Sequence, residues 1–305
     1  MFRAGFAFFW AAVAVWSAAA PVAVIHGHNA VAAGERRFAQ TLARHVERWY
    51  RESGVEVSFS DDTDLPGALA GKRVAAFVYA ANPDRAQMKA LAGFVGRGGK
   101  LLVFYSSSPE LAALMGVRTV GYRKGGTEGR WSLMRFSEER PRGVPESILQ
   151  TSSNLFLAEP LPGRSRVLAW WHDRQGRRTT EAAWLASPAG YWMTHVLLAD
   201  GDSEAKGRLL LALAGAHDAA LWAPAASSVL RKAHLVGGGV QSLSAAAGKL
   251  ADARRRSAAL SAVQVLRGKN RECAGLLSAG KGQEAWEAAN DLRSRMYEVY
   301  GMLQI

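Results

Sequence analysis

The feature that most constrains the fold is an alternation of short apolar runs and amphipathic stretches in the first third of the chain. The apolar runs lie at 21–29, 55–60, 73–83 and 101–108, and helical spacing of apolar residues occurs at 34–52, 84–95 and 109–115. Buried parallel strands have near-continuous apolar sequences, and right-handed helical crossovers connect them. The alternation therefore predicts an α/β fold built on a parallel, doubly wound sheet.

The middle of the chain is rich in strand-forming residues. Residues 117–136 have a hairpin-like composition, 151–158 can add a short strand, and a meander of strands is expected at 166–173, 181–187 and 191–199. A further helix is expected at 203–215. With 305 residues, 49% of them apolar, the chain can form about two packed units. We predict that the first is an α/β domain over 21–224 with a β-rich insertion at about 117–200, and that the second is the segment 225–305.

The C-terminal segment, 225–305, is predicted to be helical. Its apolar residues recur at near-helical spacing, and glycines at 237–239 and 280–282 interrupt the pattern. Two or three antiparallel helices, forming a hairpin or small bundle, would bury these apolar stripes against one another or across the sheet domain. The same helices could mediate a homo-oligomer.

The N-terminus has the organisation of an export signal. Residues 1–20 contain Arg3, an apolar run from 4 to 16 and then small residues, which is the order of a secretory signal peptide. The apolar run is shorter than the ~20 residues that span a bilayer. We expect an exported protein, periplasmic or extracellular, with no membrane span after signal removal. The alternative is an uncleaved N-terminal anchor.

Charge and cysteine content restrict the partners. The net charge is +12, and residues 225–305 contribute half of it through 12 basic and 6 acidic residues. A basic helix can follow phosphates, but no nucleic-acid-binding motif is present, so a solvated helix face is the simpler interpretation and no nucleic acid partner is expected. The single cysteine, Cys273, excludes an intramolecular disulfide and every multi-cysteine metal site.

Polar residues gather where the predicted parallel strands end. Ligands of such sheets bind outside the carboxyl ends of the strands. The candidate crevice residues are His26, His28, Asn29, Asp61, Asp62, Tyr79, Asn82, Tyr105 and Ser106. One hypothesis is a metal site on His26 and His28 with a carboxylate from the 61–64 loop, which would activate water for hydrolysis. Two histidines are weak evidence, so a loop pair without metal is favoured, and no metal or cofactor is predicted.

Aromatic residues crowd the predicted meander. Trp170, Trp171, Trp184 and Trp192 lie within 23 residues of one another. An exposed strip of them could stack on sugar rings, whereas core packing is the simpler interpretation because aromatic residues favour strands. His172 and His195 fall in the same predicted strands, where we expect hydrogen-bonded structural roles.

The run VAAFVYAANPDRAQMKALAGFVGRGGKLLVFYSSSPELAALMGV (74–117) resembles the class I glutamine amidotransferase-like superfamily, which has a flavodoxin-like sheet. The resemblance implies that Tyr105, Ser106 or Ser107 stands where active members carry the cysteine of a nucleophile elbow. No cysteine lies near, a Gly-x-Ser-x-Gly elbow is absent, and a phenol cannot take the place of a thiolate nucleophile. The resemblance therefore points to the degenerate, non-catalytic branch, which includes ThuA-like and β-galactosidase trimerisation domains.

A narrower resemblance covers most of 21–222. The run GGKLLVFYSSSPELAALMGV and the later segment 165–222 resemble the region ahead of the barrel in secreted family-10-like glycosyl hydrolases. It implies a non-catalytic accessory or interaction module, expected to be the N-terminal region of such a protein. The implied partner is a carbohydrate or a catalytic glycosyl hydrolase domain. A metal-dependent hydrolase that uses the crevice is the alternative function.

Overall fold

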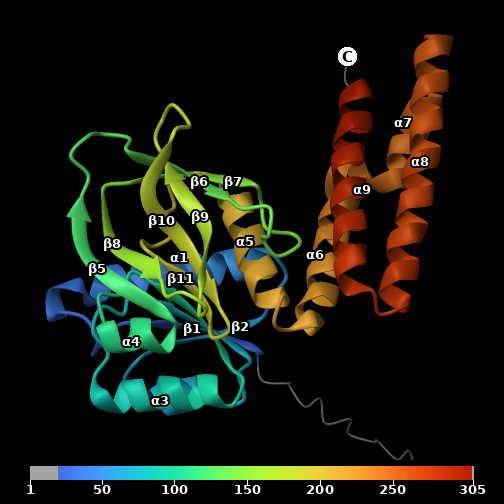
Figure 1. The fold of residues 1–305 in the computed structure, drawn as a ribbon. Helices are drawn as coiled ribbons and strands as arrows, with labels where there is room; N and C mark the ends of the chain where they lie inside the picture. The colour runs from blue at the N-terminus through green and yellow to red at the C-terminus, as the bar shows by residue number, and fades with distance from the viewer. Residues whose placement is uncertain (1–19, 304–305) are drawn as a thin grey trace, which may run out of the picture.

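In the computed structural model, which describes residues 20–303, nine strands form one mixed sheet (Figure 1). Five strands are parallel, in the order β2 (Val57–Asp61), β1 (Val22–His26), β3 (Val74–Val78), β4 (Lys100–Phe104) and β11 (Gly190–Met193). Four antiparallel strands follow, namely β10 (Arg178–Ser187), β9 (Arg166–His172), β6 (Trp131–Phe136) and β7 (Ser147–Ser152). This arrangement confirms the predicted α/β fold with added strands.

Helices cover both faces of the parallel half. Successive residues of a strand point to opposite faces, and in β1 Val22 and Val24 belong to one apolar core while Ala23 and Ile25 belong to another. The first core is closed by α1 (Arg36–Glu52) and α5 (Ser203–Gly215). The second is closed by α2 (Leu65–Leu69), α3 (Arg85–Gly96) and α4 (Pro109–Leu114). The sheet is therefore doubly wound, as predicted, and α2 is the helix that the sequence pattern did not indicate.

The segment 117–136 does not form the expected hairpin. Its two strands separate, because β5 (Val117–Lys124) pairs with β8 (Asn154–Pro160) in a two-stranded sheet while β6 pairs with β7 and β9. Residue alternation indicates which face of a strand is buried but not which strand lies beside it. The predicted short strand at 151–158 is likewise divided between β7 and β8.

A buried carboxylate links the two sheets. Glu181 of β10 is 4% exposed and accepts hydrogen bonds from Arg123 of β5, from Arg130, and from the indole nitrogen of Trp131 in β6. Burial acts to raise the pKa of Glu181, but the hydrogen bonds from Arg130, Thr179 and Trp131 outweigh it and lower that pKa to about 2. Glu181 is therefore ionised at neutral pH.

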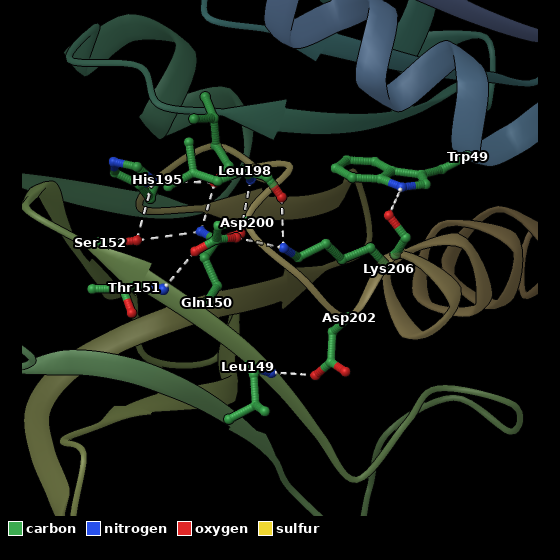
Figure 2. Close-up of polar contacts among 12 residues, drawn as sticks. Trp49, Leu149, Gln150, Thr151, Ser152, His195, Leu198, Asp200, Asp202 and Lys206 are labelled. Atoms are coloured by element: carbon green, nitrogen blue, oxygen red, sulfur yellow. Dashed lines mark hydrogen bonds and ion pairs between the residues drawn. The ribbon is translucent and has the colours of Figure 1, made fainter.

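The chain that leaves β11 covers the free edge of β7 (Figure 2). The carboxylate of Asp200 accepts the backbone N–H of Thr151 at 2.9 Å, and that of Asp202 accepts the N–H of Leu149 at 2.6 Å. Lys206, which is fully buried, donates to Asp200 at 2.9 Å. Unpaired N–H groups on an edge strand invite pairing with another chain, and these two carboxylates occupy them.

Four helices follow the α/β domain and project to one side of it as a helical arm (Figure 1). They are α6 (Trp222–Leu235), α7 (Gly239–Gly248), α8 (Ala253–Ser278) and α9 (Gly282–Leu303). Two or three helices were expected; the glycine breaks were placed correctly, and the 237–239 break separates α6 from α7. The apolar interior of the arm includes the buried Cys273 and belongs to the same core cluster as the residues under α1 and α5. No helix within 20–303 has both the length and the apolar character needed to cross a membrane, and residues 1–19 of the expected signal peptide lie outside the described part of the chain.

Candidate functional site

The loop after β1 is organised by one carboxylate. Asp62 is 1% exposed, and its two oxygens accept the backbone N–H groups of His28, Asn29 and Ala30 at 2.7–3.0 Å. Its own carbonyl oxygen accepts from the side chain of Gln87 at the start of α3. Because its oxygens are used by the backbone, Asp62 shapes the loop and is not available as a ligand-binding group.

The predicted histidine pair lies beside this loop. His26 is buried with its ring 5.5 Å from that of Phe59, and its Nδ1 lies 3.2 Å from the carbonyl oxygen of Gly27. The Asp61 carboxylate accepts from the hydroxyl and the backbone N–H of Thr63, which hold the pKa of Asp61 below its ordinary value. No three His, Cys, Asp or Glu side chains within residues 20–303 are grouped to hold a metal ion. The metal hypothesis therefore lacks a ligand set in this part of the chain.

Two tyrosines at the ends of β3 and β4 have an unusual backbone conformation. Tyr79 and Tyr105 have φ angles of +53° and +55°. Bulky residues rarely adopt the left-handed region, and such strain costs about 1–3 kcal/mol per residue. Neighbouring strands hold both in place, because Tyr79 donates its N–H to Phe104 and Tyr105 donates its N–H to Met193, each at 3.1 Å. Strain of this kind concentrates at functional sites.

The two tyrosines lie at the centre of a continuous row of five aromatic rings, called here the aromatic row. The rings of Tyr79 and Tyr105 stack with centroids 5.2 Å apart. Phe38 of α1 meets Tyr79 edge-on at 5.5 Å, Phe156 of β8 lies 4.4 Å from Tyr105, and Tyr122 of β5 lies 5.7 Å from Phe156. The end rings, Phe38 and Tyr122, are 51% and 57% exposed, whereas the central tyrosines are nearly buried.

Polar groups flank the aromatic row. The Tyr79 hydroxyl donates to Glu35 at 3.1 Å, and the Tyr105 hydroxyl donates to the side-chain oxygen of Asn154. Burial raises the pKa of both phenols, and with the nearby Glu35 carboxylate it brings that of Tyr79 to about 12. Both phenols are therefore protonated hydrogen-bond donors at neutral pH.

His195, which follows β11 beside β4, packs against this row. The His195 ring meets that of Tyr105 edge-on at 5.3 Å, and its Nδ1 lies 3.1 Å from the Val196 carbonyl oxygen and 3.3 Å from the Ser152 hydroxyl (Figure 2). Burial lowers its pKa to about 4. The expected structural, hydrogen-bonded role fits this geometry, but the predicted strand over 191–199 is too long. The strand β11 ends at Met193, where the chain leaves the sheet to cover β7, so His195 follows the strand.

The serines after β4 face a neighbouring loop. Ser106 is fully buried and its hydroxyl donates to the carbonyl oxygen of Ala81 at 3.0 Å. The Ser107 hydroxyl donates to the Asn82 side chain at 3.2 Å, and the Asn82 N–H bonds to the Ala30 carbonyl oxygen. These contacts join the loops after β1, β3 and β4. The structure thus brings the predicted tyrosines together and uses Ser106 and Asn82 to connect the loops around them.

The four tryptophans do not form an exposed strip, and core packing, the simpler of the two interpretations, fits three of them. Trp171, Trp184 and Trp192 are at most 1% exposed. Only Trp170 reaches the surface, and Arg178 lies over its ring at 5.0 Å. Neighbouring residues of a strand face opposite sides of the sheet, and here both sides are covered, so the tryptophans serve packing.

Five residues of the site were not singled out from the sequence. They are Glu35, Phe38, Tyr122, Asn154 and Phe156. Phe38 was expected on the apolar face of its helix, yet it is half exposed. The β5–β8 pairing brings the last three residues to Tyr105, and that pairing leaves no local signal in the sequence.

No protein-family model matches the chain, and no curated protein matches it. Among solved structures, a putative ThuA-like protein from Bacteroides uniformis is 14% identical, with a TM-score of 0.47 over 69% of this chain and 92% of that one. A glutamine amidotransferase from Thermotoga maritima is 12% identical, with a TM-score of 0.36 over 93% and 98%. An α-L-fucosidase isoenzyme 2 from Paenibacillus thiaminolyticus is 15% identical, with a TM-score of 0.47 over 64% of this chain and 32% of that one.

Proposed function

We propose that this chain is a non-catalytic binding module that works beside a carbohydrate-active enzyme and uses the aromatic row to hold a sugar-like ligand. The observation that carries the proposal is Tyr105, a strained and hydrogen-bonded tyrosine at the end of β4. The resemblance to the class I amidotransferase-like superfamily implies a nucleophile at this position. Export, and a catalytic glycosyl hydrolase domain as partner, belong to the same proposal and rest on the sequence resemblance.

The hydroxyl groups around Tyr105 support a non-catalytic role. A nucleophilic hydroxyl needs a base within hydrogen-bond reach. The Tyr105 hydroxyl donates to an amide oxygen, and Ser106 donates to a backbone carbonyl. Ser152 does contact His195, at 3.3 Å, but both side chains are buried, so the pair is sheltered from substrate.

The aromatic row supports a binding role. Two exposed aromatic side chains at one edge of a sheet leave apolar surface in water, which favours contact with a ligand. The phenol groups of Tyr79 and Tyr105, the Glu35 carboxylate and the Asn154 amide supply a few fixed polar contacts beside that surface. Sugars present an apolar ring face, which fits the exposed aromatic surface, and a rim of hydroxyl groups, which fits the polar side chains beside it.

Isothermal titration calorimetry of the purified protein with a panel of neutral oligosaccharides tests the proposal. We expect binding that falls at least tenfold in Tyr122→Ala and Phe38→Ala, because each removes an exposed end of the row with little effect on packing. The matched control is Tyr297→Ala, an equally exposed tyrosine on α9. Equal affinity in all variants, or no binding to any oligosaccharide, would refute the binding role.

The non-catalytic part of the proposal has a separate test. We expect the wild-type protein to hydrolyse glutamine, chromogenic glycosides and esters no faster than the Tyr105→Phe variant does. Turnover by the wild-type protein that this variant abolishes would show that Tyr105 takes part in a reaction.

A further inference from the structure

The start of α8 and the end of α9 expose apolar side chains at one end of the helical arm. We call this end, residues 249–260 and 296–303, the arm tip. Leu260 near the start of α8 is 39% exposed, and Tyr300 and Met302 in the last turn of α9 are 38% and 48% exposed. Figure 1 shows both helix ends opposite the turn between α8 and α9 and clear of the α/β domain. Exposed apolar side chains that gather in one place mark interaction sites.

A groove of about 320 Å³ lies between the two helix ends. Arg255, Ala258 and Ala259 of α8 and Met302 of α9 line it. The Arg255 guanidinium donates to the Met302 carbonyl oxygen at 3.1 Å, which joins the two helices. The alanine methyl groups and the methionine side chain make the groove apolar, so it offers packing contacts rather than hydrogen bonds.

Basic residues are concentrated at the arm tip. Lys249, Arg254, Arg255 and Arg256 lie within eight residues of one another. Consecutive residues of a helix lie about 100° apart around its axis, so the three arginines point in different directions from the start of α8. Among the ion pairs of residues 20–303, none involves Lys249, Arg254 or Arg256. These three charges therefore have no carboxylate partner in the described part of the chain.

The arginines stand where a helix favours negative charge. The N-terminal end of a helix dipole is positive, so basic residues in the first turn are unfavourable. The first turn of α8 contains no acidic residue, and the preceding Asp252 accepts the backbone N–H of Arg255 at 2.7 Å. The other acidic residue of the arm tip is the exposed Glu298, so four basic residues face two acidic ones. Local rules of this kind are broken chiefly at functional sites.

We propose that the arm tip docks on the surface of an anionic lipid bilayer. The basic side chains meet the head groups, and Leu260, Tyr300 and Met302 enter the boundary between head groups and acyl chains. Anionic leaflets attract clustered Lys and Arg side chains, and burial of neighbouring apolar side chains adds to the binding. The contact is made at the surface and needs no membrane-spanning helix.

Other occupants fit the arm tip less well. A second copy of the chain would bring the same four basic residues into the contact. A small anion would satisfy the charges but leave the exposed apolar side chains in water. Because the tip is an end of the arm, a flat surface can reach it without a matching shape (Figure 1). The tip shares no residue with the aromatic row, so this inference stands independently of the function proposed above.

A polarity-sensitive fluorophore at the tip tests the inference. The label is attached to Met302→Cys in the full chain, where Cys273 is fully buried and does not react. Vesicles contain phosphatidylcholine alone, or phosphatidylcholine and phosphatidylglycerol in equal parts. We expect a blue shift with the anionic vesicles only, and its loss at about 0.5 M salt. The readout is local because the apolar run at 4–16 can itself bind bilayers of either kind.

Charge variants in the labelled protein test the role of the basic residues. Lys249→Gln combined with Arg254→Gln should raise the anionic lipid concentration at half the shift at least tenfold. Both side chains are exposed, so the variant should fold, which circular dichroism can verify. The matched control is Arg97→Gln combined with Arg135→Gln, which removes two exposed arginines of the α/β domain and should leave the shift unchanged.

A label at Leu149→Cys is the control for position, because Leu149 is 60% exposed on β7 of the α/β domain. It should show no shift. The proposal would be overturned by no shift at position 302, by equal shifts with neutral and anionic vesicles, or by an equal loss in the two charge variants. A shift at position 149 as large as that at 302 would also overturn it. Poly-glutamate that reproduces the shift without lipid would indicate an acidic protein partner in place of the bilayer.

Discussion

At the scale of single residues, Glu181 illustrates how a buried charge is made stable. Its carboxylate has no aqueous shell, but two arginines and an indole N–H replace that shell. The amide of the Glu181→Gln variant would place an NH2 group where a carboxylate oxygen accepts, and a buried donor such as the Trp131 indole N–H that loses its acceptor costs about 1–3 kcal/mol. We expect Glu181→Gln to lower the free energy of unfolding by this amount, measured by urea denaturation at pH 7. Glu159→Gln is the control, because Glu159 pairs with Arg118 at the surface and should cost far less.

The same residue gives a pH signature. Glu181 has a folded-state pKa of about 2, below the ordinary value of 4.5. A depressed carboxyl pKa stabilises the fold fully above the unfolded-state value, and this contribution is lost as pH falls from about 4.5 through about 2. The free energy of unfolding, measured by urea denaturation at a series of pH values, should therefore fall more steeply from pH 6 to pH 2 for the wild type than for Glu181→Gln. Parallel curves would show that the pKa of Glu181 is not depressed.

Residue types alone could predict which side chains gather at the strand ends, but not what they do there. Tyr79 and Tyr105 were expected at this edge because parallel strands end together. Asp62 was expected there too, yet it bonds three backbone N–H groups, and a sequence does not tell whether a carboxylate faces backbone or ligand. Phe38 satisfies the helical spacing of α1, but it is half exposed, and its ring packs edge-on against Tyr79 while the apolar positions of α1 from Ala39 onward are buried.

At the scale of elements, the edge strand β7 depends on Asp200. Asp200→Ala removes the acceptor of the Thr151 N–H and leaves the buried Lys206 with only the Leu198 carbonyl oxygen. We expect a loss of about 2–4 kcal/mol in unfolding free energy, since an unpaired buried charge is costly. We also expect self-association, because an uncovered strand edge pairs with other chains. Urea denaturation and light scattering measure the two effects.

Two further variants separate charge from edge protection. Lys206→Met combined with Asp200→Ala should recover part of the stability, because no buried charge remains, while the tendency to associate persists. Asp202→Ala removes only the acceptor of Leu149 and should cost about 1 kcal/mol. If the double variant were as unstable as Asp200→Ala, the buried ammonium would not be the cause.

Elements were predictable where their signal is local. Four of the five parallel strands, β1 to β4, and the helices α1, α3, α4 and α5 follow from contiguous apolar runs and helical spacing. The helix α9 follows from the phase of its apolar residues. Strand partners were not predictable. β5 pairs with β8 across some 30 residues, and the side chains that pack beside the pair, Glu181 against Arg123 and Tyr105 against Phe156, come from distant segments. The half of the candidate site that comes from β5 and β8 was missed for the same reason.

At the scale of the whole molecule, the arm and the α/β domain are joined by tight contacts at glycines. Gly54 has φ +85°, and a Cβ there would meet Ser228 and the Pro224 carbonyl oxygen of α6 at 2.5 and 2.9 Å. Gly71 has a similar φ of +68° but open space around it. Alanine at Gly71 thus costs only the backbone strain of about 1–3 kcal/mol, whereas alanine at Gly54 must also push the arm away.

We therefore expect Gly54→Ala to destabilise the chain by about 1–3 kcal/mol more than Gly71→Ala in urea denaturation. Limited proteolysis should cut Gly54→Ala near residues 216–224, where the arm leaves the domain, faster than Gly71→Ala. Oligosaccharide binding at the aromatic row should be unchanged in Gly54→Ala, because Gly54 contacts α6 and no residue of the row. Equal stability and equal cleavage of the two variants would mean that the close contact of Gly54 with α6 does not hold the arm against the domain.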